Sequence, residues 1–248
     1  MKKVYLLPGL LTTGNFFCGL LGLTFVMQQQ YLYAAELCLV AMIFDFVDGQ
    51  VARIRRSSTR FGIEYDSLSD MLSFGVLPTF LAYSMVLQHM GRVGLGIAFL
   101  YSVCCALRLA RFNSQVYKEE KKVFTGLPAP AAAGLICSMI VLAGRYEIQF
   151  LTTLLPFLML SLSYLMVSTI RYPAFQGAGV RQKKPFLNLV GVIITATVVV
   201  SYPEVSFFFL FAAYTVAGVL SHYRFRRSAR YIRSLLLTSP LPEDSENP

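Results

Sequence analysis

The chain is a succession of apolar stretches, most of them close to the length that a helix needs to cross a lipid bilayer. Such a helix takes about 20 mostly apolar residues. Eight candidate spans meet or approach this requirement, at approximately residues 9–28, 31–49, 62–88, 92–111, 128–144, 148–168, 186–200 and 204–222. Charged residues make up only 14% of the sequence, against about 25% in soluble globular proteins. We therefore predict an all-α integral membrane protein, a polytopic bundle of about eight transmembrane helices.

The basic residues are distributed unevenly among the segments that connect these spans. With eight spans, 20 of the 22 lysines and arginines fall on the side of the N-terminus, and only Arg92 and Arg145 fall on the other side. Lysine and arginine are enriched in cytoplasmic loops, so both termini are predicted to be cytoplasmic. The net charge of +9 is spread over several loops and tails rather than over a soluble domain, which argues against nucleic acid as a partner.

The C-terminal end differs in composition from the rest of the chain. Residues 1–222 predict a single transmembrane domain with no dividing linker. Residues 223–237 interleave five arginines with apolar side chains, which fits either an interfacial amphipathic segment or a solvated basic tail. Residues 238–248 are polar, acidic and proline-rich, and this composition predicts disorder.

Four of the 13 acidic residues stand in a fixed frame within apolar surroundings. The frame reads Asp45-x2-Asp48-Gly49-x2-Ala52-Arg53-x8-Gly62-x3-Asp66-x3-Asp70. Positions three, four and seven apart share one face of a helix, so the first two aspartates share a face with Gly49 and Ala52. The last two aspartates share a face of the following span. Because carboxylates beside lipid are costly, we predict that these two faces meet in one functional pocket near the cytoplasmic surface.

Four carboxylates at this density repel one another unless a cation lies between them. Oxygen ligands without nearby histidine or cysteine select hard ions, so the frame predicts Mg²⁺ or Mn²⁺. Four carboxylates suit two ions, an arrangement used for displacement at phosphorus. The small residues Gly49 and Ala52 would let a ligand approach the helix backbone, and Arg53 would neutralise phosphate oxygens. The structural alternative is that the carboxylates simply pair with the neighbouring arginines at a helix end.

At every fixed position this frame is similar to the signature of the CDP-alcohol phosphotransferase family. The resemblance implies that a CDP-linked alcohol donates its phosphoryl-alcohol part to an acceptor hydroxyl and releases CMP. It implies that Asp45, Asp48, Asp66 and Asp70 bind metal and that Asp70 also takes the proton of the acceptor. The residues that the match assigns to the CDP moiety are Gly49, Ala52, Arg53, Thr59 and Gly62.

Further stretches resemble the phosphatidylserine synthase branch of that family. They are residues 7–15, where Gly9 replaces an expected asparagine, and residues 106–113, 124–133 and 169–173. Arg108 and Arg111, one turn apart at a helix end, are predicted to bind the carboxylate of serine, with Asn113 adding a polar contact. Alternatively, these arginines only anchor the helix end. Asn15 either reaches the CDP donor or is a buried amide bonded within the bundle.

The expected function is transfer of the phosphatidyl group from CDP-diacylglycerol to L-serine, at the cytoplasmic face of a bacterial or archaeal membrane. The resemblance also implies a homodimer. The nearest rival is the same chemistry with glycerol 3-phosphate, inositol phosphate or an amino alcohol as acceptor. A divalent cation transporter is a rival from another class, since intramembrane aspartates also serve as ion ligands. The transporter reading leaves Gly49, Ala52 and the arginines that follow them unexplained.

Overall fold

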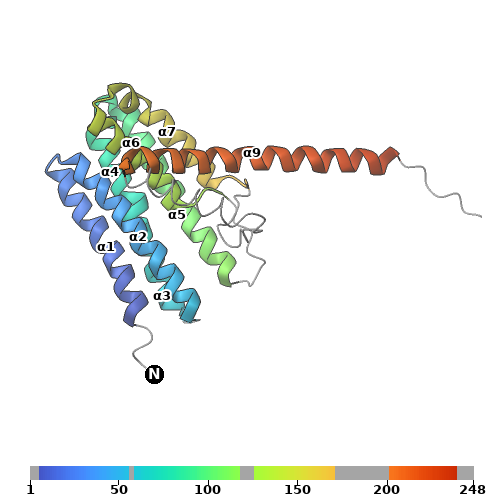
Figure 1. Ribbon diagram of the computed structural model, residues 1–248, viewed down its shortest axis with the longest axis horizontal. Helices are drawn as coiled ribbons and strands as arrows, with labels where there is room; N and C mark the ends of the chain where they lie inside the picture. The colour runs from blue at the N-terminus through green and yellow to red at the C-terminus, as the bar shows by residue number, and fades with distance from the viewer. Residues whose placement is uncertain (1–5, 56–58, 118–125, 171–200, 239–248) are drawn as a thin grey trace, which may run out of the picture.

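The computed structural model describes residues 6–55, 59–117, 126–170 and 201–238, and within these ranges every regular element is a helix (Figure 1). The elements are α1 (Leu6–Met27), α2 (Tyr31–Arg55), α3 (Arg60–Asp70), the π-helical turn η2 (Met71–Val76), α4 (Leu77–Met85), the 3₁₀ turn η3 (Leu87–Met90), α5 (Gly91–Tyr117), α6 (Ala129–Tyr146), α7 (Gln149–Val167) and α9 (Pro203–Thr238). The predicted all-α class is confirmed for this part of the chain.

Five of the described helices are long and apolar enough to cross a membrane. They cover Gly9–Met27, Leu87–Ser114, Ala129–Tyr146, Gln149–Val167 and Pro203–Ser221, and so correspond to five of the eight predicted spans. The predicted span 31–49 lies in α2, which is less apolar because it carries Glu36, Asp45 and Asp48. The predicted span 186–200 lies outside the described residues. The count of eight and the side of each terminus stay predictions.

The segment predicted as one span over 62–88 is divided into four short helical elements instead of one regular helix. Pro78 has no backbone N–H, so the carbonyl of Phe74, four residues earlier, loses its helical partner. The hydroxyl of Tyr101 on α5 donates to that carbonyl at 3.2 Å. The N–H of Leu77 reaches back five residues to the carbonyl of Leu72, which is the hydrogen bond of a π-helix. Periodicity alone does not reveal this change of helix type.

Helices α1 and α2 form an antiparallel pair that leads into this segment (Figure 1). The turn between them places Gln29 in the left-handed conformation, with φ of 61°. Glycines let α1 pack closely: a Cβ on Gly14 would lie 3.0 Å from the ring of Phe44, and a Cβ on Gly19 would lie 2.5 Å from Oγ of Ser73. The first helix is therefore held against both α2 and η2 without intervening side chains.

Helix α6 is the most buried of the five apolar helices. Two prolines mark its N-terminus: Pro128 is the N-cap residue, and Pro130 lies in the first turn. Helices α2, α7 and α9 pack around it. Gly134 admits the ring of Phe211 from α9, since a Cβ there would lie 2.6 Å from the ring. Helix α9 thus packs directly against α6, the most buried of these helices.

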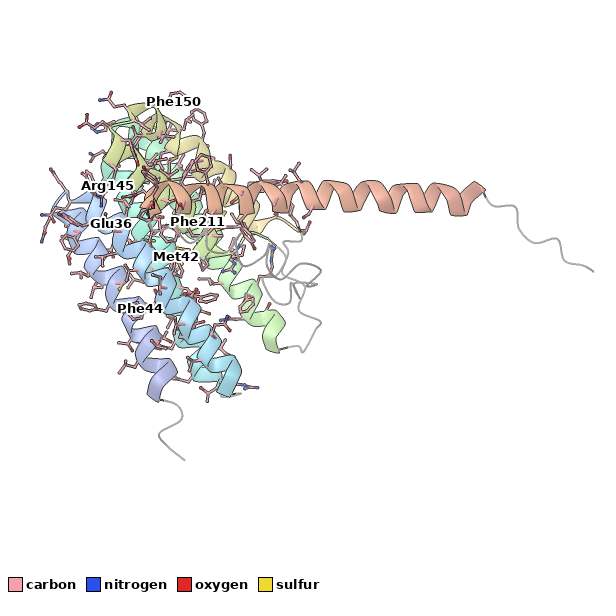
Figure 2. The ribbon with its side chains drawn as sticks, in the orientation of Figure 1. Glu36, Met42, Phe44, Arg145, Phe150 and Phe211 are labelled. Carbon is pink, nitrogen blue, oxygen red and sulfur yellow. The ribbon has the colours of Figure 1, made fainter. Side chains whose placement is uncertain are left out.

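An ionic junction joins three helices at the end of α6. Arg145 lies 3.2 Å from Glu36 on α2 and 3.5 Å from Glu204 at the start of α9 (Figure 2). Glu36 and Arg145 are 109 residues apart, so local spacing in the sequence does not reveal this contact. Helix α9 continues as one helix to Thr238, and its C-terminal part extends away from the other helices (Figure 1).

Candidate metal centre and active site

Three aspartates from two helices come together in the structure. Asp45 and Asp48 lie one turn apart on α2, and Asp66 lies on α3. One carboxylate oxygen from each can be chosen so that all three lie within 4.8 Å of one another. Asp48 is only 4% exposed. The predicted meeting of the two acidic faces is therefore observed for these three residues.

The fourth aspartate, Asp70, lies one turn beyond Asp66 on the same face of α3 and is 7% exposed. Its Oδ1 accepts a hydrogen bond from Nδ2 of Asn15 at 3.1 Å. The π-helical turn η2 begins at the next residue, and π-helical turns frequently occur at functional sites. Asp70 thus extends the acidic face toward the interior of the bundle.

The donor set fits a hard divalent cation. Within the described part of the chain, Oδ1 of Asp66 is buried and has no hydrogen-bond partner. A buried carboxylate oxygen without a partner is costly unless a ligand completes it. The three clustered residues supply only oxygen ligands, and oxygen ligands without nitrogen or sulfur are typical of Mg²⁺ and Mn²⁺ sites.

Helix α1 contributes polar partners that the acidic frame did not predict. Oγ1 of Thr12 donates to Oδ2 of Asp48 at 2.9 Å. On α3, Oγ of Ser69 donates to the carbonyl of Thr12 at 3.1 Å. The only signal in the sequence is that Thr12 and Asn15 are three positions apart on one apolar helix, since their partners are 36 and 55 residues away.

The residues predicted to hold the CDP moiety lie around the junction of α2 and α3. Thr59 caps the N-terminus of α3, where its Oγ1 accepts a hydrogen bond from the N–H of Gly62 at 3.0 Å. Gly62 is exposed, and Gly49 directly follows Asp48 on α2. Ala52 and Arg53 belong to the last turns of α2, and their side chains lie outside the described part of the structure.

The three residues predicted to bind serine point to different neighbours. Arg108 interacts electrostatically with Asp70 and Asp45, and therefore lies at the acidic site. Nη1 of Arg111 donates to the carbonyl of Val167 at the end of α7, at 3.0 Å. Asn113 donates to Glu64 on α3 at 3.2 Å and also accepts a hydrogen bond from Ser67, at 3.1 Å. Of the three, Arg108 is the residue whose interaction with the aspartates the described structure records.

Arg108 also interacts electrostatically with Tyr214 of α9. Tyr214 is half-buried and lies one turn beyond Phe211, the residue that packs on Gly134. Sequence reasoning did not single out this tyrosine, because the segment that carries it resembles no known motif. The structure brings the last described helix into electrostatic range of the arginine at the site.

Comparisons with known proteins agree with this geometry. Residues 5–170 match the family model described as CDP-alcohol phosphatidyltransferase. The chain is 37% identical over 179 residues to CDP-diacylglycerol–serine O-phosphatidyltransferase of Helicobacter pylori, covering 71% of this chain and 75% of the relative. It is 36% identical to the protein of the same name from Bacillus subtilis, covering 68% and 91%. It is 38% identical to archaetidylserine synthase of Methanothermobacter thermautotrophicus, covering 70% and 72%. The matched region contains all four aspartates of the site, and the chain therefore belongs to the CDP-alcohol phosphatidyltransferase family.

Proposed function

We propose that this protein transfers the phosphatidyl group of CDP-diacylglycerol to the hydroxyl of L-serine, giving phosphatidylserine and CMP. The observation that carries the proposal is the cluster of Asp45, Asp48 and Asp66, with Asp70 one turn further along α3. The choice of serine is supported by the names of the bacterial relatives and of the archaeal one. Transfer at phosphorus depends mainly on positioning and charge neutralisation, which such a cluster supplies once cations are bound.

The four aspartates are the proposed ligands of Mg²⁺ or Mn²⁺, with two ions for four carboxylates. When bound, the ions would neutralise the phosphate oxygens of the donor and stabilise charge that develops during transfer. Asp48 and Asp70 are buried, which keeps their carboxylates away from competing water. Arg53 adds positive charge for the leaving CMP, and Gly49, Ala52, Thr59 and Gly62 hold the rest of the CDP moiety.

Asp70 is the proposed general base. Asn15 donates a hydrogen bond to one of its oxygens, and the other oxygen is the proposed acceptor of the proton. The proton of the serine hydroxyl moves to Asp70, and the serine oxygen forms a bond to the phosphorus that carries diacylglycerol. The bond between that phosphorus and the CMP oxygen breaks, and CMP leaves with the electron pair. Atoms and charge balance without an oxidant, a reductant or a further co-reactant.

Arg108 is the proposed contact for the carboxylate of serine. It is the arginine of α5 that interacts with the acidic site, and a guanidinium can bind a carboxylate through two parallel hydrogen bonds. Arg111 and Asn113 support the same pocket from its edge, where they link α5 to α7 and α3. The same position of Arg108 would suit a phosphorylated acceptor, so glycerol 3-phosphate and inositol phosphate remain the second candidates.

The proposed setting is the cytoplasmic face of a bacterial or archaeal membrane. The apolar helices support membrane insertion, and the concentration of 20 of 22 basic residues on one side supports a cytoplasmic site. The acyl chains of the donor would then stay in the bilayer while serine and CMP exchange with the cytoplasm. A homodimer is part of the proposal on the strength of the family resemblance alone.

The test is CMP release by purified protein in detergent–lipid micelles with CDP-diacylglycerol, Mn²⁺ or Mg²⁺, and a panel of acceptors. We expect release that requires serine and disappears with EDTA. Release with glycerol 3-phosphate, inositol phosphate or an amino alcohol, but not with serine, would replace the acceptor and keep the chemistry. Cation flux into proteoliposomes without CMP release would instead favour the transporter.

A further inference from the structure

The first helix places two buried polar side chains against the acidic site, and neither belongs to the acidic frame. Thr12 and Asn15 are three residues apart, on one face of α1, and they are 5% and 0% exposed. Thr12 donates to Asp48 on α2, and Asn15 donates to Asp70 on α3. One face of one helix therefore contacts carboxylates from both acidic helices.

The contacts are reciprocated through the backbone of α1. Oγ of Ser69 donates to the carbonyl of Thr12 at 3.1 Å, and Oγ of Ser73 donates to the carbonyl of Asn15 at 3.0 Å. Ser69 and Ser73 are one turn apart, so they meet α1 at the same two positions that reach the aspartates. Together with the bonds to Asp48 and Asp70, these contacts make four hydrogen bonds that fix how far α1 can slide or rotate relative to α2, α3 and η2.

We propose that Thr12 and Asn15 are positioning residues, which fix the orientation of Asp48 and Asp70 for metal binding and proton transfer. This inference rests on the proposed function. A carboxylate with one oxygen held by a donor presents its other oxygen in a defined direction. Partners of this kind orient metal ligands, and their loss typically lowers metal affinity or activity about 10- to 100-fold.

The side-chain oxygen of Asn15 also supports a functional role. Among the described residues, Oδ1 of Asn15 is buried and has no hydrogen-bond partner. An amide that served only to join helices would be expected to use both its donor and its acceptor. The sequence left two alternatives for Asn15, contact with the CDP donor or bonding within the bundle; the observed bond is within the bundle, but it reaches Asp70 of the acidic site rather than a residue that only joins helices.

The first test measures metal binding and needs no turnover. Protein in detergent micelles without CDP-diacylglycerol is titrated with Mn²⁺, and free Mn²⁺ is followed by electron paramagnetic resonance. We expect Thr12→Val to weaken Mn²⁺ binding about 10- to 100-fold, and Thr12→Ser to restore it because serine keeps the hydroxyl. The matched control is Thr13→Val, since the neighbouring Thr13 bonds the carbonyl of Gly9 and Tyr65 rather than an aspartate.

Unchanged Mn²⁺ affinity in Thr12→Val, or an equal loss in Thr13→Val, would overturn the role of Thr12. If Thr12→Val does not give folded protein, Thr12→Ala removes the same hydroxyl without adding a methyl group and is read in the same way. Because this readout is independent of catalysis, it also separates failure of the inference from failure of the proposed reaction. If the wild-type protein is inactive but its Mn²⁺ affinity still depends on Thr12, only the proposed reaction is removed.

The second test separates the two readings of Asn15. In Asn15→Leu we expect kcat to fall at least about tenfold, while KM for CDP-diacylglycerol and the Kd for CDP in the presence of Mn²⁺ stay within twofold of wild type. A large rise in either constant would make Asn15 a contact for the donor and overturn its positioning role. An unchanged kcat would overturn that role as well.

Discussion

The hydroxyl of Tyr101 donates to the carbonyl of Phe74 at 3.2 Å, the carbonyl that Pro78 leaves without a helical partner. Both residues are fully buried. The bond ties α5 to the π-helical turn that follows Asp70, so the helix break beside the site is completed by a neighbouring helix rather than by water. This one hydrogen bond therefore stabilises the helix break and also helps to hold the segment that follows Asp70 in place.

Removing that hydroxyl should destabilise the fold. In Tyr101→Phe the buried carbonyl of Phe74 stays unsatisfied, at a cost of about 1–3 kcal/mol in the free energy of unfolding. Thermal unfolding of the detergent-solubilised protein should show a lower Tm. Tyr164→Phe is the control, because Tyr164 is 73% exposed and should keep the wild-type Tm. Equal melting of the two variants would contradict the role of Tyr101.

Replacing the proposed base should stop catalysis without unfolding the protein. Asp70→Asn keeps the size of the side chain and should lower kcat at least about 100-fold, in line with typical contributions of a general base. CMP release measures the effect, and circular dichroism checks the helical content. Near-normal turnover in this variant would remove Asp70 as the base.

Arg108 and Arg111 should behave differently although the sequence paired them. In Arg108→Gln, loss of a hydrogen bond to a charged group, about 1.5–3 kcal/mol, should raise KM for serine about 10- to 100-fold. KM for CDP-diacylglycerol should change much less. Arg111→Gln loses its bond to the carbonyl of Val167. This variant should have a lower Tm and a KM for serine close to that of the wild type. A larger effect on KM for serine in Arg111→Gln than in Arg108→Gln would refute this assignment.

Close packing of α1 should be sensitive to a single methyl group. A Cβ on Gly19 would lie 2.5 Å from Oγ and 3.2 Å from Cα of Ser73, so Gly19→Ala must displace the Ser73 hydroxyl from its bond to the carbonyl of Asn15 or move one of the two helices. We expect a lower Tm and at least a tenfold loss of turnover, because the same helix carries Thr12 and Asn15. The control is Gly96→Ala on α5, where nothing lies within 4 Å of the added atom; this change should be neutral or slightly stabilising. Wild-type turnover in Gly19→Ala would show that α1 does not position the site.

Helical spacing predicted the acidic site well because the spacing of Asp45, Asp48, Asp66 and Asp70 determines which side chains share a face. It did not show which neighbouring helix covers that face. The contact from Thr12 and the separation of Arg108 from Arg111 depend on tertiary packing. The site was therefore predictable as a set of ligands, and its supporting partners were not.

The fold of 62–88 was the other limit of sequence reasoning. Its apolar composition predicted a single span, but one proline and a tyrosine from another helix change the hydrogen-bond pattern within it. The last two predicted spans, 186–200 and 204–222, matched no motif, and the contribution of Tyr214 could not be anticipated from them. Composition sets where a helix can lie in a membrane, whereas irregularities follow from individual backbone partners.

The π-helical turn Met71–Val76 also constrains how this sequence can change in length. A turn of this type holds one more residue than an α-helical turn, and each residue of an α-helix corresponds to about 100° of rotation. Because the π-helical turn takes up its extra residue within itself, α4 keeps about the rotation that a regular helix one residue shorter would give it. Deleting one residue between Asp70 and Leu77 would therefore restore a regular helix and leave the buried face of α4 facing nearly the same way, whereas a deletion that kept the π-helical turn would rotate that face by about 100°. A gap of one residue in an alignment here would therefore mark a relative that has a regular helix at this point and keeps the arrangement of its catalytic helices.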